Sequence, residues 1–229
     1  SFTGFNFNYN NIIGISQLDT NTIIAVAYSS NLVYKTVNGG VNWQIYSIGS
    51  IGGNDLLRKA VFVNSNTGFF ITSYGAIGKS TDGGLNWTID RSFIADYFRL
   101  LVLGNVAVID SSNITIVGSG GTILRSTDTG TSWFAQSGNL RTLKSNYFTD
   151  LNTGYCVGFE GSIFKTTNGG ANWFGQSGGV NKNLKSVFFV NENTGYAAGD
   201  TGTIIKTTNG GLNWQNKTIN ILQNINSIY

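Results

Sequence analysis

Five near-copies of one eight-residue phrase, each closed by a tryptophan, constrain the fold of this chain more than any other feature. The phrase is clearest as Thr207-Thr-Asn-Gly-Gly-Leu-Asn-Trp214, and the other copies end at Trp43, Trp87, Trp133 and Trp173. Successive tryptophans lie 44, 46, 40 and 41 residues apart. A period of roughly 40–50 residues indicates an array of one supersecondary unit, stacked copy against copy.

The last complete repeat divides into four short β-rich runs separated by turn-forming residues. The runs are residues 184–190, 196–199, 203–207 and 214–218. Gly, Asn and Asp clusters between such runs are typical of antiparallel hairpins, and four strands per period correspond to one propeller blade. We therefore predict an all-β fold, a β-propeller of four-stranded antiparallel blades. The first run is the most apolar, so we expect this strand to be the one buried on both faces.

The eight-residue phrase has a local physical explanation as a tight turn. A side-chain oxygen at its third position can accept backbone N–H groups of the turn, and the glycines permit positive φ angles. The tryptophan can pack into the blade and close it. The third-position residues are Asn38, Asp82, Asp128, Asn168 and Asn209.

This phrase resembles the Asp-box, or BNR repeat, Ser/Thr-x-Asp-x-Gly-x-Thr/Ser-Trp, and the resemblance covers about residues 11–218. It implies a β-propeller with the phrase between the third and fourth strands of each blade, and a structural role for the third-position residues and the five tryptophans. In repeat style the chain is similar to photosystem II assembly-factor propellers and to secreted repeat proteins of Bacteroidota. Asn replaces the acid in three copies, which argues against chemistry at these positions.

The repeats predict a single propeller domain over residues 1–229. We place them at about residues 11–47, 57–91, 100–137, 141–177 and 182–218, with 219–229 beginning a further blade. The last assignment rests on the match between Ile225-Asn-Ser-Ile-Tyr229 and Leu184-Lys-Ser-Val-Phe188. Five complete blades with partial terminal strands predict a segment of a six- to eight-bladed ring. A closed five-bladed ring with leftover terminal strands is the alternative.

Composition excludes several functions. The chain has no His and a single Cys, Cys156, which removes the commonest metal ligand, the commonest general base and any internal disulfide. We predict no metal site, no cofactor and no catalytic residue, and a buried, structural Cys156. Only 11% of residues are charged, the net charge is +3, and no Lys/Arg run occurs, so nucleic acid is not an expected partner. The sequence has no apolar window of about 18 residues, so we do not expect membrane insertion.

A cation directly precedes every phrase. These residues are Lys35, Lys79, Arg125, Lys165 and Lys206. They could form a ring of positive charge. We favour the other interpretation, in which each aliphatic stem covers its hairpin partner while the charge stays in water.

A binding site is expected on the blade ends opposite the phrase turns, where the second-to-third-strand turns and the inter-blade linkers lie. Exposed aromatic and charged residues there would suit a sugar or a peptide. The candidates are Tyr28, Arg58, Tyr74, Arg91, Asp96, Arg99, Arg141, Phe159, Glu160 and Asp200. Ordinary loop variation is the alternative explanation of these residues.

Three function classes remain open. The favoured one is a non-catalytic extracellular module, secreted or on the cell surface or in the periplasm, that presents a rigid face to a protein or glycan partner, as part of a larger chain or assembly. The second is a glycoside hydrolase of sialidase-like or xyloglucanase-like type, for which Glu160 with Asp200 or Asp96 would be the acid pair. The sialidase Arg-Ile-Pro motif is impossible here because the chain has no Pro. The third is an assembly factor for a membrane complex.

Overall fold

A computed structural model of the chain describes residues 12–28, 31–52, 55–92, 102–136, 141–219 and 221–229. By its internal contacts the chain divides into two compact units, residues 1–99 and 100–229, and each is described by itself. None of the helical segments in the described ranges has the length and apolar character needed to cross a membrane.

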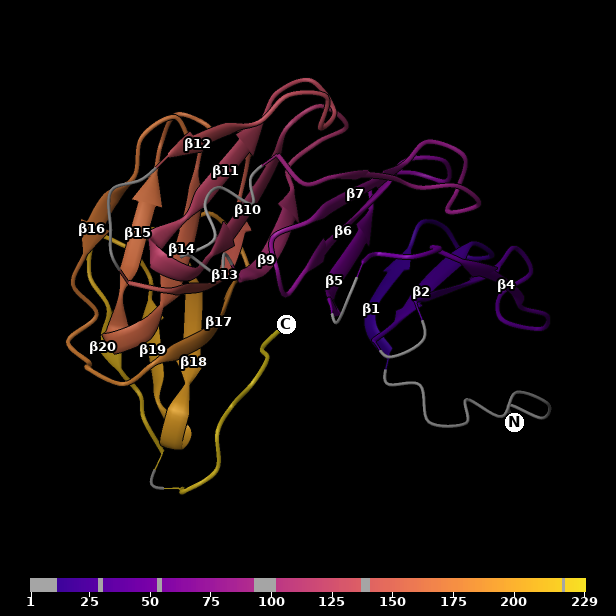
Figure 1. The fold of residues 1–229 in the computed structure, drawn as a ribbon. Coiled ribbons are helices and arrows are strands. Elements are labelled where there is room, and N and C mark those ends of the chain that lie inside the picture. Colours follow the sequence, from indigo (N-terminus) through magenta and orange to yellow (C-terminus); the bar gives the residue numbers. More distant parts are fainter. Residues whose placement is uncertain (1–11, 29–30, 53–54, 93–101, 137–140, 220) are drawn as a thin grey trace. The chain divides into compact units, whose positions relative to one another are not determined.

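The first unit contains two four-stranded antiparallel sheets (Figure 1). One sheet comprises β1 (Ile12–Gln17), β2 (Ile23–Ala27), β3 (Leu32–Thr36) and β4 (Gln44–Ser47). The other comprises β5 (Leu57–Phe62), β6 (Gly68–Thr72), β7 (Ile77–Ser80) and β8 (Thr88–Asp90). Strands β1 and β5 lie side by side, so the first strands of the two sheets are neighbours.

The second unit contains three sheets of the same kind. They comprise β9 (Leu103–Val108), β10 (Ile114–Gly118), β11 (Ile123–Ser126) and β12 (Phe134–Gln136); β13 (Leu143–Phe148), β14 (Gly154–Gly158), β15 (Ile163–Thr166) and β16 (Phe174–Gln176); and β17 (Leu184–Phe189), β18 (Gly195–Gly199), β19 (Ile204–Thr207) and β20 (Gln215–Asn216). Short 3₁₀ turns, η1 (Ser119–Gly121), η2 (Phe159–Gly161) and η3 (Asp200–Gly202), join the second and third strands. Strand β13 lies between β9 and β17.

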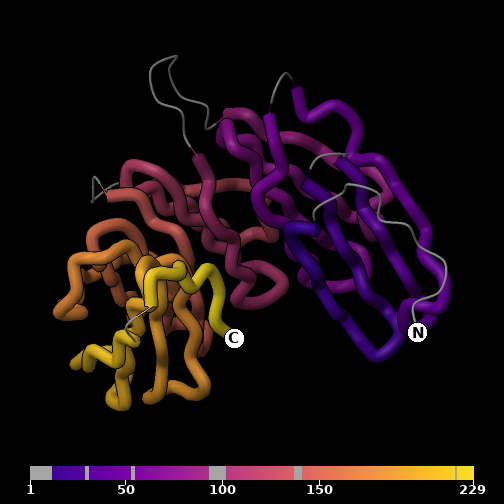
Figure 2. The backbone as a smooth tube through the Cα atoms, turned by 90° about the horizontal axis from the view of Figure 1, so that it is seen from below, coloured from indigo at the N-terminus to yellow at the C-terminus, as the bar shows by residue number. Residues whose placement is uncertain are grey.

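Each sheet is an up-and-down meander in which strands follow one another in sequence order. The predicted all-β architecture of four-stranded antiparallel blades is confirmed, and we call the sheets blades from here on. Figure 2 shows the last residues of the chain, in yellow, running back along the blade β17–β20.

The second strand of each blade, not the first, is the strand buried most completely. Every residue of β6, β10 and β14 is buried, whereas β9 and β13 each leave several side chains half-exposed. The prediction that the first strand is buried on both faces is therefore wrong. A second strand has a hydrogen-bonded neighbour on each side and is also packed on its faces, whereas a first strand borders the open edge of its sheet.

Neighbouring blades share apolar cores. In the second unit Tyr155, Leu184, Phe189 and Ile205 pack together between the blades β13–β16 and β17–β20. The Tyr155 and Phe189 rings stack with centroids 3.9 Å apart. Cys156 on β14 is fully buried among apolar residues, as predicted, and this burial raises the pKa of its thiol well above the ordinary value.

Candidate functional site

The phrase turns form a self-contained hydrogen-bond network. In the fourth copy the Thr166 hydroxyl accepts the Gly170 N–H at 2.9 Å and donates to Asn168 Oδ1 at 3.0 Å. The same Oδ1 accepts the Asn172 N–H at 2.9 Å. The other four copies repeat this pattern with Asn or Asp at the third position.

The two acidic copies are held in the ionised state. Hydrogen bonds from the Ser132 side chain and then its backbone lower the pKa of Asp128 to about 2, despite some desolvation. Bonds from the Asn86 backbone and side chain lower the pKa of Asp82. A carboxyl that remains charged and serves as an acceptor cannot act as a general acid near neutral pH. The phrase turns therefore supply rigidity and no proton donor.

The cations that precede the phrases connect neighbouring blades. Arg125 Nε donates to the Gly169 carbonyl at 2.6 Å, and Lys165 Nζ donates to the Gly210 carbonyl at 2.6 Å. Lys35 Nζ lies 3.5 Å from the Gly83 carbonyl. Each acceptor is the first glycine of the phrase in the following blade. These three residues are only partly buried, and beyond the interpretation from the sequence each has a backbone carbonyl of the neighbouring turn as a partner for its charged group.

The candidate residues of the first unit lie on separate elements. Tyr28 is half-buried after β2, Arg58 is exposed on β5, and Arg91 is exposed after β8 with its guanidinium against Gly52. Tyr74, 40% exposed, donates its backbone N–H to Asp55 Oδ1 at 2.9 Å. Asp96 and Arg99 lie outside the described residues.

In the second unit the candidates Arg141 and Glu160 lie together, and Asp200 pairs with another cation. Arg141 Nη2 lies 3.0 Å from Glu160 Oε2 in an exposed ion pair. Asp200 pairs with Lys185 at 2.8 Å, which is the main cause of the lowered pKa of this carboxyl. Next to Glu160, the candidate Phe159 is 39% exposed and lies under the Lys144 ammonium, 4.9 Å from its ring centroid.

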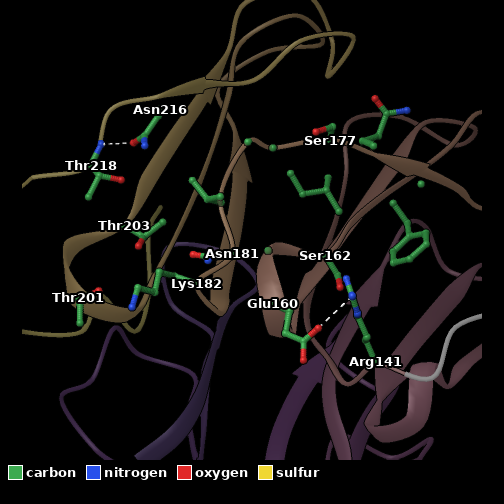
Figure 3. Close-up of a pocket in the computed structure, with 18 residues that line it drawn as sticks. Arg141, Glu160, Ser162, Ser177, Asn181, Lys182, Thr201, Thr203, Asn216 and Thr218 are labelled. Carbon is green, nitrogen blue, oxygen red and sulfur yellow. Dashed lines mark hydrogen bonds and ion pairs between the residues drawn. The ribbon is translucent and has the colours of Figure 1, made fainter.

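A groove of about 950 Å³ opens between the blades β13–β16 and β17–β20 (Figure 3). The linker between these blades forms its floor. Gly178 of this linker is buried, and a Cβ added to it would lie 2.7 Å from Ile163 Cδ1 and 3.0 Å from Ile205 Cδ1. The Arg141–Glu160 pair lines one part of the groove, and Lys182 lies nearer η3. This groove is the candidate functional site.

Most groove side chains are neutral and polar. The hydroxyls belong to Ser162, Ser177, Thr201, Thr203 and Thr218, and the amides to Gln176, Asn181 and Asn216. Within the described part of the chain, the side chains of Gln176 and Asn181 make no hydrogen bond, so their amides can pair with a ligand. Phe164, half-buried, is the single aromatic ring among the described lining residues.

Sequence reasoning missed the polar lining and Lys182. The longer linkers lie in other blades. The candidate residues were chosen for charge and aromaticity, a criterion that excludes Ser, Thr, Asn and Gln. A signal was nevertheless present, because Gly178-Gly179 interrupts the linker beside Asn181 and Lys182. Adjacent glycines let a chain lie deep between two sheets, where bulkier residues would fill the space.

No protein-family model matches the sequence, and no curated protein sequence matches it. Solved structures do. YCF48 from Cyanidioschyzon merolae superposes with a TM-score of 0.72 at 16% identity, over 91% of this chain and 72% of that one. An ancestral GH74 enzyme superposes with a TM-score of 0.69 at 21% identity, over 90% of this chain and 31% of the enzyme. PorZ, a surface component of the type-IX secretion system of Porphyromonas gingivalis, gives a TM-score of 0.65 at 11% identity, over 90% and 28%.

These neighbours are β-propellers, so the Asp-box propeller architecture expected from the repeats is confirmed. At such identities the likeness shows the fold alone. The roles of the neighbours differ, and one fold hosts many functions, so the function must be argued from the groove.

Proposed function

We propose that the protein is a non-catalytic binding module whose inter-blade groove receives an extended polypeptide segment of a partner protein. The observation that carries this proposal is the groove lining, a row of hydroxyl and amide side chains with the Arg141–Glu160 pair and Lys182 among them. Sites for small apolar ligands are mostly apolar. A polar groove bounded by two rigid sheets instead suits a chain that brings its own backbone N–H and C=O groups.

The carboxylates support a non-catalytic role. Glu160 and Asp200, the pair that a glycosidase would need, are each paired with a different cation, Arg141 and Lys185. Two carboxyl groups that flank one glycosidic bond must be free to transfer a proton and to attack, whereas each of these is engaged in an ion pair of its own.

A peptide fits the groove better than a glycan. Sugar-binding sites commonly offer an exposed aromatic ring for stacking, and Phe164 is half-buried. The groove supplies charges of both signs and free amides, which match peptide side chains and backbone. A glycan partner is an outcome that the experiment below distinguishes.

We further propose a secreted or cell-surface location. The low content of charged residues and the abundance of Asn and Thr support it. A role as an assembly factor for a membrane complex is a narrower form of the same proposal, in which the partner segment belongs to that complex.

The test is selection of ligands for the whole chain from a phage-displayed library of random peptides and, in parallel, from an immobilised glycan array. Asn181→Trp would fill the groove, whereas Leu212→Trp places the same indole side chain on an exposed phrase turn at the other end of the blade. We expect selected peptides to lose at least about tenfold in affinity with Asn181→Trp and to change less than about twofold with Leu212→Trp.

Equal losses in the two variants, or ligands found on the glycan array alone, would contradict the peptide proposal. Turnover of glycoside substrates that Glu160→Gln abolishes would contradict the non-catalytic assignment.

A further inference from the structure

One face of the blade β17–β20 carries a tyrosine–lysine pair. The preceding blade, β13–β16, carries the equivalent pair and uses it to bind the blade that follows. On the blade β13–β16, the Tyr155 hydroxyl and the Lys165 ammonium both donate to the Gly210 carbonyl, at 2.8 and 2.6 Å. Tyr196 and Lys206 occupy the corresponding positions, opposite each other on β18 and β19. Their mutual geometry is the same, with the ammonium 5.3 Å from the ring centroid against 5.5 Å in the earlier pair.

The end of the chain already lies on this face as a first strand would. The Ile228 N–H donates to Ser186 Oγ at 3.2 Å, as the Val187 N–H donates to Ser145 Oγ at 3.4 Å one repeat earlier. The Thr201 N–H donates to Asn224 Oδ1 at 3.1 Å, a contact that Glu160 and Asn183 make at the same distance. Residues 224–228 therefore lie on this blade in the register that residues 183–187 adopt on the preceding one.

The first-strand contacts on this face are thus made by residues 224–228, whereas the contact between the tyrosine–lysine pair and a phrase turn is not. Within the described residues, Tyr196 and Lys206 hold no hydrogen bond to a phrase-turn carbonyl. Tyr229 is 99% exposed, whereas its counterpart Phe188 packs edge-on against Tyr147 with centroids 5.3 Å apart.

We propose that this face binds the second, third and fourth strands of a further Asp-box blade, joined to Tyr229, of which residues 225–229 are the first strand. The first glycine of its phrase turn presents a carbonyl to both Tyr196 and Lys206. A second copy of the chain does not fit this role, because its blades bring their own first strands to a position that residues 225–229 occupy.

The test appends a second copy of residues 189–229 to Tyr229, so that the native residues 225–229 become the first strand of a complete blade. The control appends the same residues in scrambled order. We expect hydrogen exchange at the Ile225 and Ile228 amides to slow by at least about tenfold in the first protein and to change less than about twofold in the control.

Lys206→Met and Tyr196→Phe test the proposed receptor. Each should accelerate exchange at Ile228 by about fivefold to tenfold in the extended protein and by less than about twofold in the parent chain. Equal effects in the two proteins, or no slowing over the scrambled control, would overturn the proposal.

A second variant covers failure of the extended protein to fold. In it, Ile225-Asn-Ser-Ile-Tyr229 is replaced by Leu-Lys-Ser-Val-Phe before the same extension. Folding of this variant alone would show that the native residues 225–229 are not a first strand, and so would overturn the proposal. Native mass spectrometry of the parent chain provides the last check, because head-to-tail association abolished by Lys206→Met would identify a second copy as the occupant instead.

Discussion

Lys165 on β15 donates a 2.6 Å hydrogen bond to the carbonyl of Gly210, which lies 45 residues further along the chain in the phrase turn of the next blade. Tyr155 donates to the same oxygen at 2.8 Å, and its ring lies where a Cβ on Gly211 would be only 2.8 Å from Cε1. Gly211 therefore has a second use beyond its positive φ angle. Because it has no Cβ, the turn approaches the preceding blade closely enough for a cation and a phenol to share one acceptor.

Removing the shared contact should loosen the second unit. We expect Lys165→Met to lower the free energy of unfolding by about 1.5–3 kcal/mol, as for a charge-assisted hydrogen bond, and Tyr155→Phe by about 1 kcal/mol. Because both donors use one oxygen, the double variant should lose measurably less or more than the sum of the two. Urea denaturation of the four proteins measures this, and Lys217→Met, an exposed lysine, should cost less than about 0.5 kcal/mol.

Tyr155 should make stability depend on alkaline pH. Burial, and secondarily the charge of Asp150, raise the pKa of Tyr155 to about 12. The neutral phenol is thus favoured in the folded state, and its contribution is fully present below pH ~10 and is lost as the pH rises toward 12. We expect the midpoint of thermal unfolding to fall more steeply over this range in the parent protein than in Tyr155→Phe. Parallel curves for the two proteins would contradict the assignment.

Asp128 should produce the opposite dependence in acid. Its pKa is depressed to about 2, so the stabilisation by the charged carboxylate is present above about pH 4 and is lost as the pH falls toward 2. Asp128→Asn keeps the acceptor oxygen and removes the titration. We expect thermal unfolding midpoints of the parent and the variant to be similar at neutral pH, and the parent to lose more on acidification. A larger acid-induced loss in the variant would argue against this account.

Gly178 should be far less replaceable than Gly179. A Cβ at position 178 would lie 2.7 Å from Ile163 Cδ1, so Gly178→Ala should cost about 1–3 kcal/mol through overpacking and should distort the groove floor. Gly179 has φ +65° and open space around it, and Asn tolerates that conformation, so Gly179→Asn should cost less than about 1 kcal/mol. Urea denaturation of both variants makes the comparison, and equal costs would show that the linker does not lie as described.

Cys156 provides an internal probe of blade opening. Its thiol is fully buried and its pKa is raised, so a thiol reagent can attack only after β14 is exposed. We expect modification under native conditions to be at least about a thousandfold slower than in the unfolded chain, which corresponds to about 4 kcal/mol of opening free energy. Rapid native reaction would contradict the burial.

The repeat pattern was sufficient to predict the strands because apolar runs and turn-forming residues are local features of the sequence. The predictions that fail concern features that depend on contacts between different segments. The fourth strand was expected over residues 214–218, yet β20 ends at Asn216, because the Asn216 side chain accepts the Thr218 N–H and turns the chain away. The groove could not be inferred from residue types, since its depth depends on how far Gly178 enters between Ile163 and Ile205. The role of Lys165 was missed for the same reason, because its acceptor belongs to the next repeat.

The bond from Lys165 to Gly210 has a consequence for how such a chain can change its length. The repeats that contain Lys35, Arg125 and Lys165 each donate to the phrase turn of the repeat that follows, so this contact has a direction along the chain. Duplication of one repeat therefore creates a complete new junction from existing parts, in nearest-neighbour fashion. An isolated repeat, by contrast, would lose both of its partners at once.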